Sequence, residues 1–167
     1  DMFDFSWDRV RQTLEEEQPD VVGITCLTKQ RASPLEVAKL SKTINKDCVV
    51  IMGGIHPTIM YEQVLEHWPV DIIVLGEGEE TIKELMVCLK GKRALGDVHG
   101  IAYKHQGKTI KTPPRQLIHN MDDIPFPAYK YFDFVDDIFT VNKNRVIDLC
   151  KEIIDRKLDI VWDCETQ

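Results

Sequence analysis

The residues best suited to holding a ligand lie where three apolar stretches of the sequence end. These ends are Thr25-Cys26-Leu27-Thr28, then Gly53-Gly54 with His56, and then Gly76-Glu77-Gly78. Glycine adopts positive φ angles, and because it lacks a Cβ atom it lets the backbone approach a ligand closely. Any one of these glycines could serve only a tight turn, but a plain turn does not need two adjacent glycines. The sequence therefore predicts a ligand-binding edge made of loops.

Motifs for nucleotides and for catalysis are absent from these ends. Gly76 and Gly78 lack the third glycine of a dinucleotide fingerprint, because Thr81 stands in its place, and no phosphate loop with Gly-Lys-Ser or Gly-Lys-Thr occurs. The clustered aspartates of a response regulator are also missing. We find no nucleophile–base pair and no paired carboxylates with a chemical role, so we assign no catalytic residue and no metal ligand.

The cysteines are scattered and odd in number, and none forms a Cys-x-x-Cys or Cys-x-x-x-Cys-x-x-Cys motif. The sequence therefore offers no cradle for a metal ion or an iron–sulfur cluster. The pattern fits reduced thiols in a cytoplasm better than a disulfide framework. We expect most of these cysteines to be small buried apolar residues.

Three strands have to position the ligand-binding edge, at residues 21–25, 48–52 and 71–75. They are apolar almost throughout rather than alternating, which is typical of strands in a sheet covered on both faces. Helices of about a dozen residues separate them, so parallel order and right-handed crossovers are expected. The fold class is therefore α/β, with a doubly wound, flavodoxin-like parallel sheet.

Two helix starts have clear capping signals. Ser6 is placed to cap a helix that extends to about Glu17. Ser33 is predicted to cap the next helix, with Pro34 at the first helical position and Glu36 completing a capping box. Both helices then carry apolar residues at helical spacing.

The pattern changes after residue 95, and it divides the sequence into three parts. A β-hairpin with a turn at Gly107 is predicted near residues 100–111, followed by an extended, proline-rich stretch. A strand near residues 134–140, a helix near 143–157 and a strand at 158–162 form a β-α-β fragment. The predicted parts are an α/β domain (1–95), a hairpin and extended connector (96–133) and the β-α-β fragment (134–167).

Composition and charge exclude several functions. The 167 residues carry a formal net charge of −7, which argues against nucleic acid and against an anionic membrane surface as partners. The apolar runs are too short to span a bilayer. The start of the sequence has no basic stretch followed by an apolar one, so no signal peptide is predicted and a cytoplasmic location is expected.

The ordered set of strand ends resembles the cobalamin-binding domain of cobalamin-dependent radical S-adenosylmethionine (SAM) enzymes. The resemblance is carried by Val-Val-Gly-Ile-Thr-Cys-Leu from Val21, Gly-Gly-Ile-His-Pro-Thr from Gly53, and Gly-Glu-Gly-Glu from Gly76. The hairpin and the stretch from Asp122 to Ala128 resemble the family's connector. The part from residue 134 onward is similar to a β-α-β unit of the radical SAM barrel.

The resemblance implies a cofactor and a set of contacts for it. In this family the nucleotide tail of cobalamin passes along the strand ends, a [4Fe–4S] cluster cleaves S-adenosylmethionine, and the reaction is methyl transfer to, or oxidative cyclisation of, an unactivated carbon. The protein's own part is to hold and orient the corrin. The implied cofactor-binding residues are Thr25, Cys26, Leu27, Thr28, Gly53, Gly54, His56, Gly76, Glu77 and Gly78.

The sequence departs from the family pattern in three ways. It has no Asp-x-His-x-x-Gly motif for a lower-axial histidine on cobalt, a feature that family members often lack. The first, central strand of the sheet is not in the sequence, and the cysteine triplet that binds the cluster is missing between the connector and Phe134. The cluster and S-adenosylmethionine would therefore be held by a missing radical SAM domain of the same protein, and this chain alone should be inactive.

Two other functions stay open at this point. The chain could be a cofactor-free α/β interaction or scaffold domain, because a sheet without its first strand has only part of a pocket. The unpaired edges of such a sheet also favour association into a homo-oligomer. A small-molecule enzyme on a flavodoxin-like sheet is the third alternative, but no residue constellation supports it.

Overall fold

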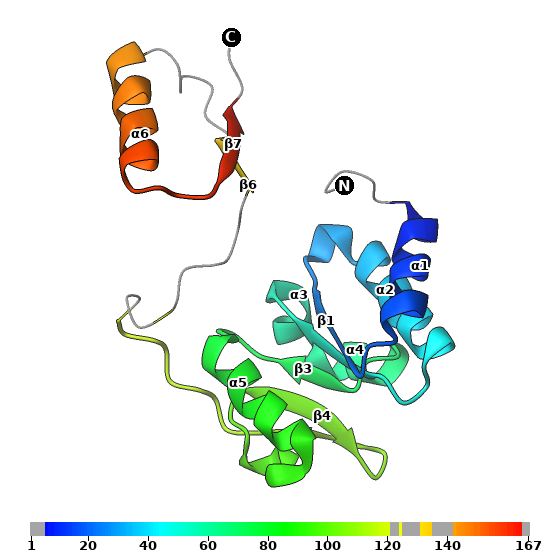
Figure 1. Cartoon of the computed structure of the whole chain (residues 1–167). Helices are drawn as coiled ribbons and strands as arrows, with labels where there is room; N and C mark the ends of the chain where they lie inside the picture. The colour runs from blue at the N-terminus through cyan, green and yellow to red at the C-terminus, as the bar shows by residue number, and fades with distance from the viewer. Residues whose placement is uncertain (1–5, 121–123, 125–130, 135–141, 165–167) are drawn as a thin grey trace. The chain divides into compact units, whose positions relative to one another are not determined.

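The computed structural model describes residues 6–120, 124, 131–134 and 142–164. The chain divides into two compact units, Asp1–Met121 and Asp122–Gln167, and each is described by itself (Figure 1). None of the helices in the described ranges has the length and hydrophobicity needed to cross a membrane.

The first unit contains a five-stranded sheet with the strand order β1-β2-β3-β4-β5. The strands β1, β2 and β3 are parallel to one another, β4 is antiparallel to β3, and β5 is antiparallel to β4. Their bounds are Val21–Thr25 (β1), Val49–Gly53 (β2), Ile72–Val74 (β3), Ile101–His105 (β4) and Lys108–Lys111 (β5). The three parallel strands are those predicted from the apolar runs, and the α/β class is confirmed.

Helices connect the parallel strands and follow the last of them. The α-helices of this unit are α1 (Trp7–Glu17), α2 (Ala32–Ile44), α3 (Ile55–Ile59), α4 (Tyr61–His67) and α5 (Glu79–Val87). Short helical turns are η1 (Thr28–Gln30), η2 (Cys88–Lys92) and η3 (Leu95–Asp97). As predicted, the Ser6 side chain caps α1, where it accepts a hydrogen bond from the Arg9 backbone N–H.

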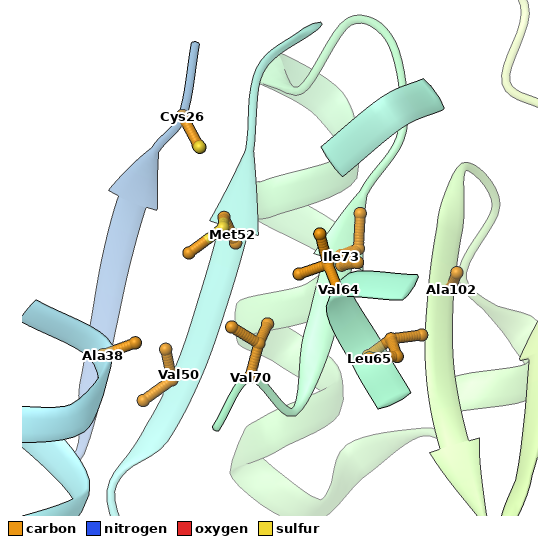
Figure 2. Close-up of a cluster of buried hydrophobic side chains, with 9 residues drawn as sticks. All are labelled: Cys26, Ala38, Val50, Met52, Val64, Leu65, Val70, Ile73 and Ala102. Carbon is orange, nitrogen blue, oxygen red and sulfur yellow. The ribbon is translucent and has the colours of Figure 1, made fainter. Parts of the chain in front are cut away.

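The strands bury both of their faces because successive residues point into two different cores. Val50 and Met52 join one core with residues of α2 and α4, and Figure 2 shows this cluster. Ile51 lies between them in sequence and joins the second core, together with Leu85 of α5. Helices therefore cover the sheet on both faces, as a doubly wound fold requires.

The strand β1 lies at one edge of the sheet. None of its residues is fully buried, in contrast to the three residues of β3, which all are. The exposure follows from position, because among the described residues β1 pairs only with β2.

The hairpin belongs to the sheet of the first unit. The sequence analysis assigned it to the connector, but β4 pairs with β3 through Ile101, Ala102 and Tyr103. Its turn has positive φ angles at both Gln106 and Gly107, as in the two-residue turns that suit the twist of a hairpin. These three β4 residues are buried, so the hairpin completes the core.

The start of α2 differs from the prediction. The helix begins at Ala32 with Arg31 at the N-cap position, and no side chain caps it. The prediction of a cap at Ser33 was wrong because η1 and Arg31 already have helical conformation, so the helix extends back past Ser33.

The carboxylate of Asp71 joins β2 to the segment before β3. It accepts hydrogen bonds from the Val50 N–H at 2.7 Å and from Lys42 Nζ at 2.7 Å, and Lys42 also donates to the Cys48 carbonyl. Val50 is fully buried, so its N–H has no access to water if the carboxylate is removed.

We therefore expect Asp71→Ala to lower the free energy of unfolding by about 1–3 kcal/mol, the cost of a buried donor left unsatisfied. Urea denaturation followed by circular dichroism measures this change. Asp47→Ala removes the same charge from an exposed side chain and should change stability by less than about 0.5 kcal/mol. Equal effects of the two substitutions would contradict the role of Asp71.

The second unit contains a parallel pair of strands joined by a helix. These elements are β6 (Tyr131–Phe134), α6 (Lys143–Asp155) and β7 (Val161–Cys164). The helix agrees with the prediction, and Asn142 caps it by accepting from the Arg145 N–H. The first strand begins earlier than predicted, and most of the predicted span, residues 135–140, lies outside the described residues.

Candidate functional site

The three predicted strand ends lie at one edge of the sheet, because β1, β2 and β3 are parallel. Ligands of open α/β sheets bind beyond this carboxyl edge. Four large apolar side chains that follow β1 or β2 are exposed here, which provides surface for a bulky ligand: Leu27, Ile55, Ile59 and Met60.

The ends of β1 and β2 are joined by backbone hydrogen bonds. The Cys26 N–H donates to the Gly53 carbonyl at 2.9 Å, and the Cys26 carbonyl accepts from the His56 N–H at 3.2 Å. Gly54 has a φ of 102°, and a Cβ atom there would lie 2.9 Å from the Cys26 carbonyl oxygen. Gly54 is therefore required for the close contact between the two loops.

Cys26 contributes backbone to this edge and its side chain to the core. The residue is fully buried, and its thiol lies in the cluster shown in Figure 2. Burial raises the pKa of the Cys26 thiol, and the nearby positive charge of Arg31 offsets only part of this effect. The thiol therefore stays protonated at neutral pH, unlike a thiolate that binds metal or acts as a nucleophile.

A cavity of about 460 Å³ opens between the end of β1 and the helices α3 and α4. It brings together two of the predicted residues, Thr28 and His56, and adds Arg31, which the sequence analysis missed. The His56 ring packs against Trp68 with a centroid distance of 5.7 Å. The remaining lining residues are Ile59, Met60 and Gln63.

The end of β3 borders a second, smaller cavity of about 220 Å³, with Gly76 and Glu77 in its wall. The Gly76 N–H donates to Thr58 Oγ1 at 3.1 Å, and Glu77 Oε2 accepts from the Ile118 N–H at 2.9 Å. A Cβ atom on Gly76 would meet nothing within 4 Å, so its neighbourhood is open. Gly78 lies at the start of α5 and packs on Val74.

Arg115 fixes the chain that leaves the hairpin and passes this second cavity. Its Nε donates to Thr81 Oγ1 at 2.8 Å and its Nη2 to Glu84 Oε2 at 2.6 Å, both on α5. The Arg115 side chain is only 19% exposed. The sequence gave no signal for this contact, since more than thirty residues separate the partners.

Residues 2–86 match the sequence model of a known family, described as the B12 binding domain. This match includes every one of the three strand ends. The chain belongs to the B12-binding domain family. The cobalamin-binding family predicted from the strand ends is therefore confirmed.

Curated relatives extend the similarity beyond this domain. An uncharacterised methyltransferase of Pyrococcus horikoshii is 30% identical over 227 residues, which cover 98% of this chain and 50% of the relative. An anaerobic magnesium-protoporphyrin IX monomethyl ester cyclase of Rubrivivax gelatinosus is 38% identical over 126 residues, covering 72% of this chain and 23% of the cyclase. The B12-binding chain thus spans half or less of the length of these relatives.

A solved structure agrees in fold and in sequence. The cobalamin-dependent S-adenosylmethionine radical enzyme OxsB with aqua-cobalamin bound superimposes with a TM-score of 0.65 and 25% identity, over 75% of this chain and 18% of OxsB. The similarity to cobalamin-dependent radical SAM enzymes that the strand ends predicted is therefore confirmed.

The alignment with the Pyrococcus protein also contains residues that this chain lacks. It extends over 227 positions, whereas the chain has 167 residues. At least 60 aligned positions therefore hold a residue only in the relative.

Proposed function

We propose that this chain is the cobalamin-binding module of a larger cobalamin-dependent radical SAM enzyme that methylates or cyclises an unactivated carbon. The observation that carries the proposal is the B12-binding family match over residues that form one open, apolar carboxyl edge with a cavity beside it. The names of its relatives, methyltransferases and cyclases, support the reaction class.

The residues present fit a corrinoid with a nucleotide tail. The tail would lie along the ends of β1 and β2, and the exposed apolar residues would cover it. Bound cobalamin would supply the methyl-transfer or cyclisation chemistry, while this chain holds and orients the corrin. The proposed contacts are Thr25, Leu27, Thr28, Gly53, His56, Gly76, Glu77 and Gly78, with Gly54 and Cys26 shaping the loops that present them.

The [4Fe–4S] cluster and S-adenosylmethionine belong, in this proposal, to a radical SAM domain that is not in this chain. The described residues contain no group of three or more His, Cys, Asp or Glu side chains that could hold a metal ion. The parallel strands β6 and β7, joined by α6, support the assignment of residues 134–167 to part of a radical SAM barrel. The aligned positions missing from this chain are consistent with an absent segment that carries the cluster cysteines.

Mixing the purified chain with hydroxocobalamin tests the binding function. We expect the corrin absorption spectrum to shift and cobalamin to co-elute with the chain in size-exclusion chromatography, because the strand-end loops and the cavity are formed within one unit. An unrelated acidic protein of similar size serves as the control for non-specific uptake. A chain that produces neither change would instead fit the cofactor-free scaffold function. The same elution profile reports whether the chain forms the homo-oligomer proposed for the β1 edge.

A further inference from the structure

The start of α2 presents unpaired backbone donors at the carboxyl edge. The helix has 13 residues, and no side chain accepts from the N–H groups of its first turn. Such N–H groups carry partial positive charge and attract anions. A helix start alone does not make a site, so the side chains beside it have to be considered.

Arg31 adds a full positive charge at the same place. Its Nη1 donates to the Thr28 carbonyl at 3.2 Å, which leaves most of its donors available. Within the part of the chain that the structure describes, no carboxylate pairs with this guanidinium. The cavity that Arg31 lines also has no Asp or Glu in its wall. A single uncompensated cation here contrasts with the net charge of −7 of the whole chain.

His56 is the second and independent indication of a ligand. The residue is only 8% exposed, yet among residues 6–120 neither ring nitrogen has a hydrogen-bond partner. Burying a polar group without a partner is unfavourable. The ring lies in the wall of the cavity shared with Thr28 and Arg31, so its partner has to come from the cavity.

We infer that Arg31, Thr28 and His56 form a subsite for the phosphodiester of the cobalamin nucleotide tail. This inference rests on the proposed function. The side-chain amides of the corrin are uncharged, so the phosphodiester is the one ionised group on the periphery of the cofactor. A guanidinium matches two phosphate oxygens at once, and the Thr28 hydroxyl and an imidazole N–H supply further donors. The exposed side chains of Ile59 and Met60 flank the subsite with apolar surface for the rest of the tail.

Corrinoids that differ only in the tail test this subsite. Cobinamide lacks both the phosphate and the base, cobinamide phosphate restores the phosphate alone, and cobalamin has the complete tail. For the wild-type chain we expect the phosphate to increase affinity by about tenfold, the effect of charge-assisted hydrogen bonds. In Arg31→Gln this gain should disappear, whereas the affinity for cobinamide itself should not change. Spectrophotometric titration measures each affinity.

Lys29→Gln is the matched control. It removes the same charge two residues away, from an exposed side chain that does not line the cavity. The gain from the phosphate should stay within about twofold of the wild-type value in this variant. His56→Asn, with folding checked by circular dichroism, should reduce the gain as Arg31→Gln does.

The outcomes separate the inference from the function on which it rests. If wild-type chain binds cobalamin but Arg31→Gln keeps the full gain from the phosphate, the subsite is wrong and cobalamin binding stands. A wild-type chain that binds cobinamide and cobinamide phosphate equally would also overturn the subsite. If inorganic phosphate binds as tightly as cobinamide phosphate, the site recognises free phosphate and the inference fails. A chain that binds none of the corrinoids overturns both proposals.

Discussion

Replacing Gly54 by alanine is expected to destabilise the first unit strongly and to abolish cobalamin binding. With φ at 102° and ψ at −179°, Gly54 occupies a region that only glycine adopts easily, and this conformation costs a residue with a side chain roughly 1–3 kcal/mol. The new Cβ atom would also lie 2.9 Å from the Cys26 carbonyl oxygen, a backbone atom held in place by a hydrogen bond from the His56 N–H. Urea denaturation and hydroxocobalamin titration measure the two effects.

Gly53→Ala is the control for this substitution because the two glycines are adjacent. A Cβ atom on Gly53 would first meet the Val74 Cβ atom at 3.9 Å, an ordinary contact, and its φ angle is not positive. We expect its free energy of unfolding to stay within about 1 kcal/mol of wild type. If the nucleotide tail passes Gly53, its affinity for cobalamin falls while its stability does not. A Gly54→Ala chain as stable as Gly53→Ala would disprove the steric role of Gly54.

The second large effect is expected from Arg115→Gln, which should lower the free energy of unfolding by roughly 1.5–3 kcal/mol. The substitution removes a charge-assisted hydrogen bond to Glu84, a partly buried carboxylate that then has lost its cationic partner. It also weakens the attachment of the chain after β5 to α5. Chemical denaturation measures the stability, and amide hydrogen exchange in β4 and β5 reports the loosening.

A pair on the same helix provides the comparison. Lys83 and Glu80 form an ion pair with both side chains about half exposed. Lys83→Gln should therefore cost less than about 0.5 kcal/mol. A double-mutant cycle with Glu84→Gln isolates the contact of Arg115, and a coupling energy near zero would show that the contact contributes nothing to stability.

The parallel strands could be predicted because their signal is local and redundant. Each is a run of apolar residues that both cores require, so residues such as Ile51 and Ile73 identify their strands without knowledge of the fold. The cap at Ser33 failed for the opposite reason. A capping signal is only a few residues long, and the preceding turn at Thr28–Gln30 displaced it by starting the helix earlier.

The candidate site could be predicted in position but only partly in detail. The strand ends locate the edge, since parallel strands bring their carboxyl ends together. The sequence cannot show that Gly54 serves a contact with Cys26, because 28 residues separate them and the contact depends on register. Arg31 and Arg115 escaped notice because a lone arginine in a polar stretch has no pattern of its own.

The hairpin determines from which edge the chain leaves the first unit. Two added strands, β4 and β5, reverse the chain twice, so Thr112 and Pro113 return to the level of Ile101 and Gly100, where β4 began. With β4 alone the exit would lie at the opposite edge, about 15 Å away along the five residues of that strand. The even parity of the added strands delivers the linker to the ligand edge. Whatever follows in the intact protein is therefore tethered beside the loops that would hold the cofactor.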